Sequence, residues 1–186
     1  MVVSEEPALA RREPPPDPQR TQFDEIVREQ WTAVYKLLYT LTGNAHDTED
    51  LTQETFLKAL DRFKTFHGGN LRAWLLRIAS NAFFDQRRRK QRVKFGPLAA
   101  EVPEESQPPD HRMDVAEQHQ LLKAAMQELS ETTRMVFHLR ATENLSFREI
   151  AKILKTSEEA ARWHMHQART KLLAKVSPRP EGERGQ

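Results

Sequence analysis

The chain contains no cysteine, and this absence excludes disulfide frameworks, thiolate metal centres and cysteine nucleophiles. Long apolar runs are lacking too, because no stretch approaches the roughly 18 consecutive apolar residues typical of a membrane helix. The N-terminus begins MVVSEEPALARREPPP, which does not have the basic-then-apolar order of a signal peptide. We therefore expect a soluble, cytoplasmic protein without membrane insertion.

Glycine is scarce, and the chain shows neither strand-like alternation nor a hairpin turn. The apolar residues follow a helical period instead, so the expected fold class is all-α. The sequence also has no glycine-rich phosphate loop, no metal-ligand spacing and no recognisable nucleophile–base pair, so it predicts neither an enzyme nor a cofactor or metal. A formal net charge of +2 and a pI of about 9.0 make the balance basic, but where the charges lie is more informative.

Changes in composition divide the chain into two small helical domains with loose ends. Proline and charge dominate the N-terminal extension, and proline with acidic residues dominates the middle, so neither stretch has enough apolar material to build a core. The predicted segments are a disordered extension over 1–20, a helical domain over 21–94, a flexible acidic linker over 95–113, a second helical domain over 114–175 and a disordered tail over 176–186.

Apolar spacing also predicts individual helices and their buried sides. The expected helices run from Phe23 to Leu41, from about Asp47 to Phe63 and from about Leu71 to Arg92, then through the periodic stretch Leu121–Leu139, from about Phe147 to Leu154 and from about Glu158 to Lys175. The expected buried residues are Thr52, Phe56, Ala59, Leu60 and Phe63 on the second helix, Leu71, Leu75, Ala79, Ala82 and Phe83 on the third, and Ala161, Met165, Ala168 and Leu172 on the last.

The last two helices have the pattern of a helix-turn-helix. Ser146 and Glu149 have the spacing of a capping box, which predicts the start of a helix. Ser157 is a plausible cap for the helix that follows. Two short helices across such a tight turn are typical of DNA-binding motifs, although unrelated helical pairs can imitate them.

Trp163 lies nearly opposite the buried side of the last helix at about 100° per residue, so we expect it to be exposed. Arg162, His166, Gln167 and Arg169 share or border that exposed face, and such side chains suit phosphates and base edges. Packing of Trp163 against the linker or a dimer mate stays open as an alternative. A metal site is disfavoured because His164 and His166 point about 200° apart, not to one face as at i and i+4.

The third helix carries a second stripe beside its apolar side. Its members are Trp74, Arg77, Asn81, Phe84 and Arg88, and the run RRRKQR follows it. Aromatic, basic and amide side chains at this spacing indicate stacking with unpaired bases. The alternative is that Trp74 and Phe84 are ordinary core residues.

The second helix has a mostly acidic stripe facing away from its buried side. The stripe contains Asp50, Gln53, Glu54, Leu57 and Asp61. It would repel nucleic acid, so it favours docking to a protein, with plain solubility as the alternative.

Three segments in this order resemble the bacterial extracytoplasmic-function sigma factors of the sigma-70 family. They are DTEDLTQETFLKAL, LRAWLLRIASNAFFDQRRRKQR and LSFREIAKIL…ARTKLL, and the resemblance extends over residues 21–175. It implies that the two helical domains are sigma domain 2 and sigma domain 4, the latter containing the helix-turn-helix. It further implies that the chain binds core RNA polymerase, directs it to promoters and promotes strand opening.

The resemblance also implies which residues touch which partner. On core polymerase, the clamp helices of the largest subunit would contact Asp50, Gln53, Glu54 and Leu57. The flap of core polymerase would be a second contact of the chain. The −10 element would be read by Lys64, Phe66, His67, Asn70, Trp74, Arg77, Asn81, Phe84 and Arg88, with the loop over 64–70 holding a flipped-out base. The −35 element would be read by Arg140, Ser157, Arg162, Trp163, His166, Gln167 and Arg169. An anti-sigma factor is a further implied partner.

The chain departs from the family pattern at the helix-turn-helix. Lys155-Thr156 stands where the family usually has Gly-Ile, so we expect a looser turn. Trp163 and His164 replace a small, usually hydroxyl residue and an arginine, so the −35 preference of relatives does not transfer. The rival interpretation is a stand-alone helix-turn-helix regulator, which leaves the acidic stripe and the Trp74 stripe without a function.

Overall fold

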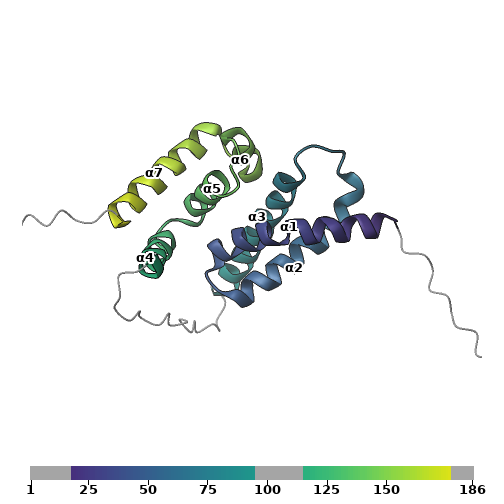
Figure 1. The fold of residues 1–186 in the computed structure, drawn as a ribbon, viewed down its shortest axis with the longest axis horizontal. Coiled ribbons are helices and arrows are strands. Elements are labelled where there is room, and N and C mark those ends of the chain that lie inside the picture. Colours follow the sequence, from purple (N-terminus) through teal and green to yellow (C-terminus); the bar gives the residue numbers. More distant parts are fainter. Residues whose placement is uncertain (1–17, 95–114, 177–186) are drawn as a thin grey trace, which may run out of the picture.

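The computed structural model describes residues 18–94 and 115–176, and within these ranges it contains α-helices, one short 3₁₀ helix and no strand (Figure 1). The all-α prediction is confirmed. The elements are α1 Pro18–Thr42, α2 Ala45–Arg62, the 3₁₀ helix Phe63–Thr65, α3 Leu71–Lys94, α4 Val115–Gln127, α5 Glu131–Ala141, α6 Phe147–Leu154 and α7 Glu158–Val176. The predicted extension, linker and tail fall almost wholly outside the described residues. None of the described helices is both long and apolar enough to cross a membrane.

The first three helices form an N-terminal module whose boundaries follow from local chemistry. Gly43, at φ +78°, ends α1 and donates its N–H to the Tyr39 carbonyl at 3.0 Å. Asn44 then begins α2, because its side chain accepts the N–H of Asp47 at 2.8 Å. Asn70 begins α3 in the same way, accepting the N–H of Ala73 at 3.0 Å.

The core of this module matches most of the predicted buried sides, but Phe63 and Leu71 are only partly buried and Leu60 is exposed. Leu75, Ala79, Ala82 and Phe83 are buried on α3, and Thr52, Phe56 and Ala59 are buried on α2. Leu60 was expected to be buried but is 44% exposed. It lies near the end of α2 and lines a groove against α1, which leaves it uncovered by the helices that the structure describes.

The last four helices form a C-terminal module that contains the predicted helix-turn-helix. The capping box at Ser146 and Glu149 is present, and the Ala160 N–H donates to the Ser157 Oγ at 3.1 Å. Lys155 itself adopts the left-handed conformation, at φ 54° and ψ 47°. The Thr156 N–H then reaches the Ala151 carbonyl at 3.0 Å. The turn therefore closes without glycine, with Lys155 in the left-handed conformation that glycine adopts freely.

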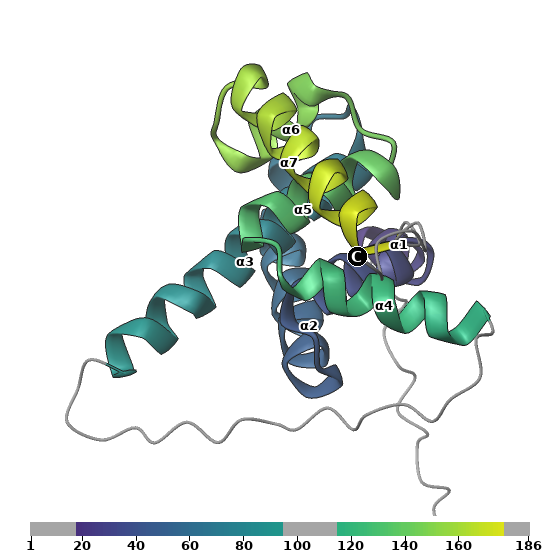
Figure 2. The ribbon, with the colours of Figure 1, turned by 90° about the vertical axis from the view of Figure 1, so that its left-hand side faces the viewer.

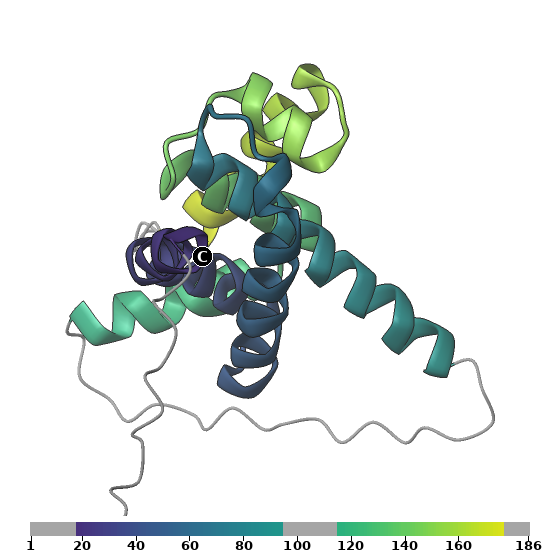
Figure 3. The ribbon, with the colours of Figure 1, turned by 90° about the vertical axis from the view of Figure 1, so that its right-hand side faces the viewer.

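The two modules lie against each other. Helix α5 packs on α1 and α6 packs on α3, and Figures 1 and 2 show both helices of the C-terminal module beside the N-terminal one. One cluster of buried residues runs through both modules, joining Leu37, Leu38 and Leu75 to Met135 and Ile150. Nothing in the sequence pattern indicated this contact. The end of α3, which carries the basic run, projects away from the rest of the fold (Figures 2 and 3).

Candidate nucleic-acid and protein-docking surfaces

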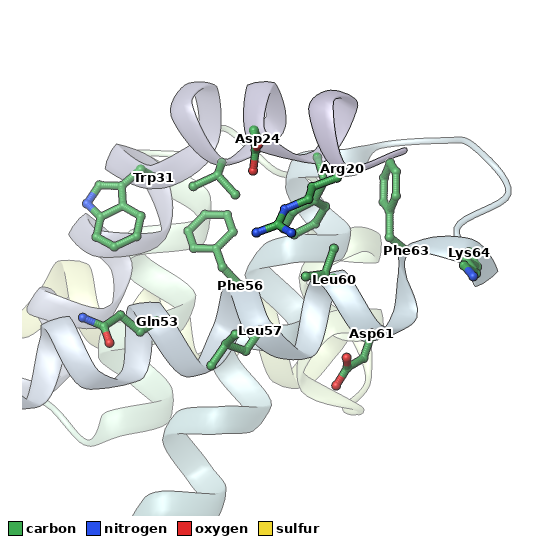
Figure 4. Close-up of a pocket in the computed structure, with 12 residues that line it drawn as sticks. Arg20, Asp24, Trp31, Gln53, Phe56, Leu57, Leu60, Asp61, Phe63 and Lys64 are labelled. Carbon is green, nitrogen blue, oxygen red and sulfur yellow. The ribbon is translucent and has the colours of Figure 1, made fainter. Parts of the chain in front are cut away.

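A groove of about 840 Å³ lies between α1 and α2. Its apolar lining includes Trp31, Phe56, Leu57 and Leu60, and Figure 4 shows these side chains along the gap between the two helices. The rings of Trp31 and Phe56 stack at 5.5 Å, and Leu57 is 65% exposed. Such a strip of exposed apolar surface beside charged residues is typical of a site that receives another protein.

The four predicted docking residues all lie on α2, and two of them line this groove. Asp50, Gln53 and Leu57 are exposed, and Gln53 and Leu57 line the groove itself. Glu54 is half-buried and paired with Lys58 at 2.6 Å, one helical turn further on. The sequence analysis missed Trp31 and Leu60 as members of this surface, because both sit on helical stripes that read as core.

The loop before α3 gathers part of the predicted −10 set around a second pocket. This pocket is about 570 Å³ and is lined by Phe66, His67, Asn70, Trp74 and Arg77, among others. The rings of Phe66 and Trp74 lie 5.1 Å apart, and both are half-buried. Gly68 and Gly69 take φ values of +91° and +100°, which L side chains rarely adopt, so the loop depends on them.

The remaining predicted −10 residues lie elsewhere. Asn81 and Phe84 are half-buried further along α3, and Arg88 is exposed and paired with Asp85. Lys64 lines the groove between α1 and α2 and not the pocket. Trp74 combines both sequence interpretations, because it packs against the core and also lines the pocket.

The predicted −35 face on α7 is open. Trp163 is 57% exposed, and Arg162, His166 and Arg169 are exposed beside it, while Ala161, Met165, Ala168 and Leu172 are buried on the other side. The predicted buried row and the exposure of Trp163 are therefore confirmed, whereas Gln167, expected on the exposed face, is half-buried. His164 turns towards α5, where its Nδ1 lies 2.9 Å from the Thr133 Oγ1, and burial lowers the pKa of this histidine.

Phe147 holds two predicted DNA contacts together, and the sequence analysis did not single it out. The guanidinium carbons of Arg140 and Arg162 lie 5.2 and 4.7 Å from the centre of its ring. Arg140 also donates from Nη1 to the Leu145 carbonyl at 2.9 Å. The Phe147 ring, at the start of α6, attracts both cations by cation–π interaction and keeps them close to each other. The available signal in the sequence was that Arg140 and Arg162, both predicted to contact DNA, lie on either side of Phe147 in the chain.

No group of three potential metal ligands occurs among the described residues. The described surfaces thus consist of an apolar groove with acidic neighbours, an aromatic pocket and a helix displaying arginine, tryptophan and histidine. Surfaces of these kinds are typical of proteins that bind nucleic acid and a protein partner.

Comparison with known proteins identifies the two modules. The family model for sigma-70 region 2 matches residues 26–93, and the model for sigma-70 region 4 matches residues 119–172. The chain belongs to the extracytoplasmic-function sigma factors of the sigma-70 family.

Curated relatives agree with this assignment. The chain is 35% identical to the ECF RNA polymerase sigma factor SigE of Mycolicibacterium smegmatis, over 83% of this chain and 63% of that protein. It is therefore matched to somewhat less than two thirds of that relative's length. It is 29% identical to the ECF RNA polymerase sigma factor SigM of Bacillus subtilis, over 82% of this chain and 93% of that protein.

Solved structures share the fold. The sigma factor RpoE of Bartonella quintana, in complex with the anti-sigma factor NepR, aligns with a TM-score of 0.69 at 24% identity, over 84% of this chain and 97% of that one. CnrH, in complex with the cytosolic domain of CnrY, aligns with a TM-score of 0.58 at 25% identity, over 83% and 87%.

Proposed function

We propose that this chain is a sigma factor that binds core RNA polymerase, directs it to promoters by reading −35 and −10 elements, and promotes strand opening. The observation that carries the proposal is the order of the two matched regions on two modules, each with a surface suited to its part of the task. The role is regulatory, since polymerase supplies the chemistry.

The proposed contact with core polymerase is the groove between α1 and α2 and its acidic border. Leu57 and Leu60 offer exposed apolar area at the centre, and Asp50 and Glu54 supply negative charge at the side. An apolar centre with a charged border is the usual anatomy of a specific protein interface. The clamp helices of the largest subunit are the partner that the family resemblance implies, and we place them here.

The proposed single-strand site is the pocket next to α3. Phe66 and Trp74 offer ring faces, and Asn70 and Arg77 offer donors beside them. Extruding a base costs a few kcal/mol, and stacking on an aromatic side chain returns about 1–3 kcal/mol per base. Capture of an unpaired base therefore offsets most of the cost and shifts the promoter towards its open form.

The proposed duplex reader is α7. Arg162, Trp163 and His166 project from its exposed face, where they can meet base edges in a major groove. Arg140 and Arg162, held on the Phe147 ring, are placed to contact phosphates. Phosphate contacts fix the position of the helix, and base contacts supply specificity.

An anti-sigma factor is a further proposed partner. RpoE, which shares this fold, was solved with the anti-sigma factor NepR bound, and CnrH was solved with the cytosolic domain of CnrY bound. The partner of this chain would cover the same surfaces and so keep it from polymerase.

Run-off transcription is the decisive test of the proposed function. Core enzyme with this chain should initiate at a cognate promoter, and core enzyme alone should not. A stand-alone helix-turn-helix regulator would neither co-purify stoichiometrically with core enzyme nor stimulate initiation, and that result would overturn the proposal.

The docking surface is tested by reversing one charge. Glu54→Lys should weaken binding to core polymerase at least about tenfold, because it reverses one charge of the acidic stripe proposed to dock there. Glu29→Lys is the matched control, since Glu29 is exposed on α1 and lies outside the predicted docking residues of α2. Equal affinities of the two variants for core enzyme would remove the α2 stripe from the interface.

A further inference from the structure

Trp163 and His164 touch each other although they are neighbours on one helix. Their ring centres lie 4.9 Å apart with the planes at 76°, which is an edge-to-face contact. Consecutive residues of a helix do not face each other, so this contact requires a particular rotamer of each side chain. Helical spacing does not supply it, and the contact therefore depends on what fixes each ring.

The ring of His164 is fixed from α5. Its Nδ1 lies 2.9 Å from the Thr133 Oγ1, and Thr133 is only 5% exposed. Thr133 belongs to the first turn of α5, and the side chain of Ser130, which caps that helix, accepts the Thr133 N–H at 3.3 Å. A buried residue at a capped helix start has little freedom, so it is a firm anchor for the histidine.

The direction of this hydrogen bond follows from the number of protons. The Ser130 Oγ donates to the Thr133 Oγ1 at 2.7 Å. The Thr133 hydroxyl accepts that bond and still has one proton of its own, which it donates to His164. The His164 Nδ1 is therefore an acceptor, which requires a neutral ring with its proton on Nε2. Burial lowers the pKa of His164, and this agrees with a neutral ring at neutral pH.

We propose that Thr133 and His164 are positioning residues for the reading of −35 DNA, because together they hold the Trp163 ring in the orientation in which α7 presents it to the major groove. This inference rests on the proposed function and deepens it, since it names the residues that set the geometry of the reading helix. Thr133 is buried below the exposed face. Its effect on recognition passes through the two rings and not through a contact of its own with DNA.

An exposed tryptophan that reads DNA needs such support. Trp163 is 57% exposed, and the buried row of α7 lies on the other side of the helix, so the core does not restrain the ring. Immobilising a free side chain on binding lowers the affinity, and a ring that is fixed beforehand avoids this loss. Arg162 is restrained in a similar way from α6, because its guanidinium carbon lies 4.7 Å from the centre of the Phe147 ring. The reading face is thus held from both α5 and α6.

The restraint on Trp163 is tested without DNA, by NMR relaxation of the tryptophan indole N–H groups. In the wild-type protein we expect the Trp163 indole to have an order parameter near about 0.85, as in rigid backbone, and Thr133→Val should lower it below about 0.6. Thr133→Ser keeps the hydroxyl and should retain the wild-type value. Trp31 and Trp74 lie on the other module and are internal references. A Trp163 order parameter no lower in Thr133→Val than in wild type would overturn the proposal.

The effect on recognition is tested by a double-mutant cycle, with a duplex that the wild-type protein enriches from a random-sequence library as the probe. Thr133→Val should weaken binding of this duplex about three- to tenfold, the range expected when one side chain is left free. In the Trp163→Ala background the same change should alter the affinity less than about 1.5-fold, because no ring remains to be positioned. Equal losses in both backgrounds, or no loss in either, would overturn the proposal.

Two control variants separate positioning from folding. Thr133→Ser should bind the duplex as the wild type does, because it restores the hydrogen bond to His164. Thr132→Val removes a neighbouring hydroxyl of α5 that makes no hydrogen bond within residues 18–94 and 115–176, and it should leave the affinity unchanged. A loss in Thr132→Val as large as in Thr133→Val would assign the effect to the fold of α5 and contradict the proposal. The role in transcription is judged separately, by run-off transcription with the wild-type protein.

Discussion

The two proposed DNA surfaces are built in opposite ways. The pocket beside α3 uses half-buried residues, because Trp74 packs against the core while it faces the pocket. The face of α7 is separate from the core, because Trp163 points away from a complete row of buried residues. In the pocket, the same side chains would bind DNA and stabilise the fold. On α7, the side chains that would bind DNA are separate from those that stabilise the fold.

This difference follows from what each surface has to hold. An unpaired base needs rigid ring faces at a fixed separation, and packing against a core provides that rigidity. A helix in a major groove needs side chains that project, and its rigidity comes from the opposite face. Substitutions at the two surfaces should therefore differ in their effects on folding.

The largest contrast is expected between the two tryptophans. Trp74→Ala should lower the free energy of unfolding by about 2–3 kcal/mol, because it removes core contacts and the Phe66 ring contact. Trp163→Ala should change it by less than about 0.5 kcal/mol and weaken binding of −35 duplex. Denaturant unfolding and duplex titration measure both quantities. Similar losses of stability would erase the contrast.

The next effect concerns the ring that carries two arginines. Phe147→Leu keeps apolar bulk but removes the ring face, so duplex affinity should fall several-fold. The slope of log affinity against log salt should become shallower by up to about 2, as two phosphate contacts loosen. Phe147→Tyr is the matched control and should retain the wild-type slope. An unchanged slope in Phe147→Leu would show that the ring does not position the arginines.

A smaller effect is expected in the turn between α6 and α7. Lys155 holds a left-handed conformation that costs an ordinary residue roughly 1 kcal/mol, and glycine adopts it freely. Lys155→Gly should therefore stabilise the protein by up to about 1 kcal/mol, reduced by the greater entropy of glycine in the unfolded chain. Thermal unfolding is the measurement. A lower melting temperature would mean that the lysine side chain contributes more than its backbone costs.

The smallest effect is a pH dependence from His164. Burial lowers its pKa from the ordinary 6.5, so the folded state resists protonation and the unfolded state binds the proton more readily. The contribution to stability is complete above pH 6.5 and is lost as the pH falls below it. Wild-type protein should lose more thermal stability between about pH 7.5 and about pH 5.5 than His164→Gln. Identical losses in both proteins would exclude this histidine as the cause.

Sequence periodicity was sufficient for most local features. The buried row of α7, the capping box at Ser146 and the span of α6 all follow from spacing alone, and all are observed. Periodicity failed at Leu60, which has the spacing of a core residue but is left 44% exposed by the helices of residues 18–94 and 115–176. Periodicity identifies a helix face, and it cannot say whether another element covers that face.

The proposed site residues were predicted unevenly for the same reason. Phe66, Asn70, Trp74 and Arg77 do share one pocket, but Lys64, from the same predicted set, lines a different hollow. Phe147 was missed because its contacts to Arg140 and Arg162 join residues on three different helices.

By itself the sequence determined the helical class, the two modules and the exposed face of the last helix, because these depend on residues within a few turns of each other. Only the tertiary structure decided that the modules pack together, that Arg134 caps α1 and that Glu149 reaches Asn70. Those contacts join residues far apart in the chain, and their geometry is set by how whole helices pack, which no local spacing records.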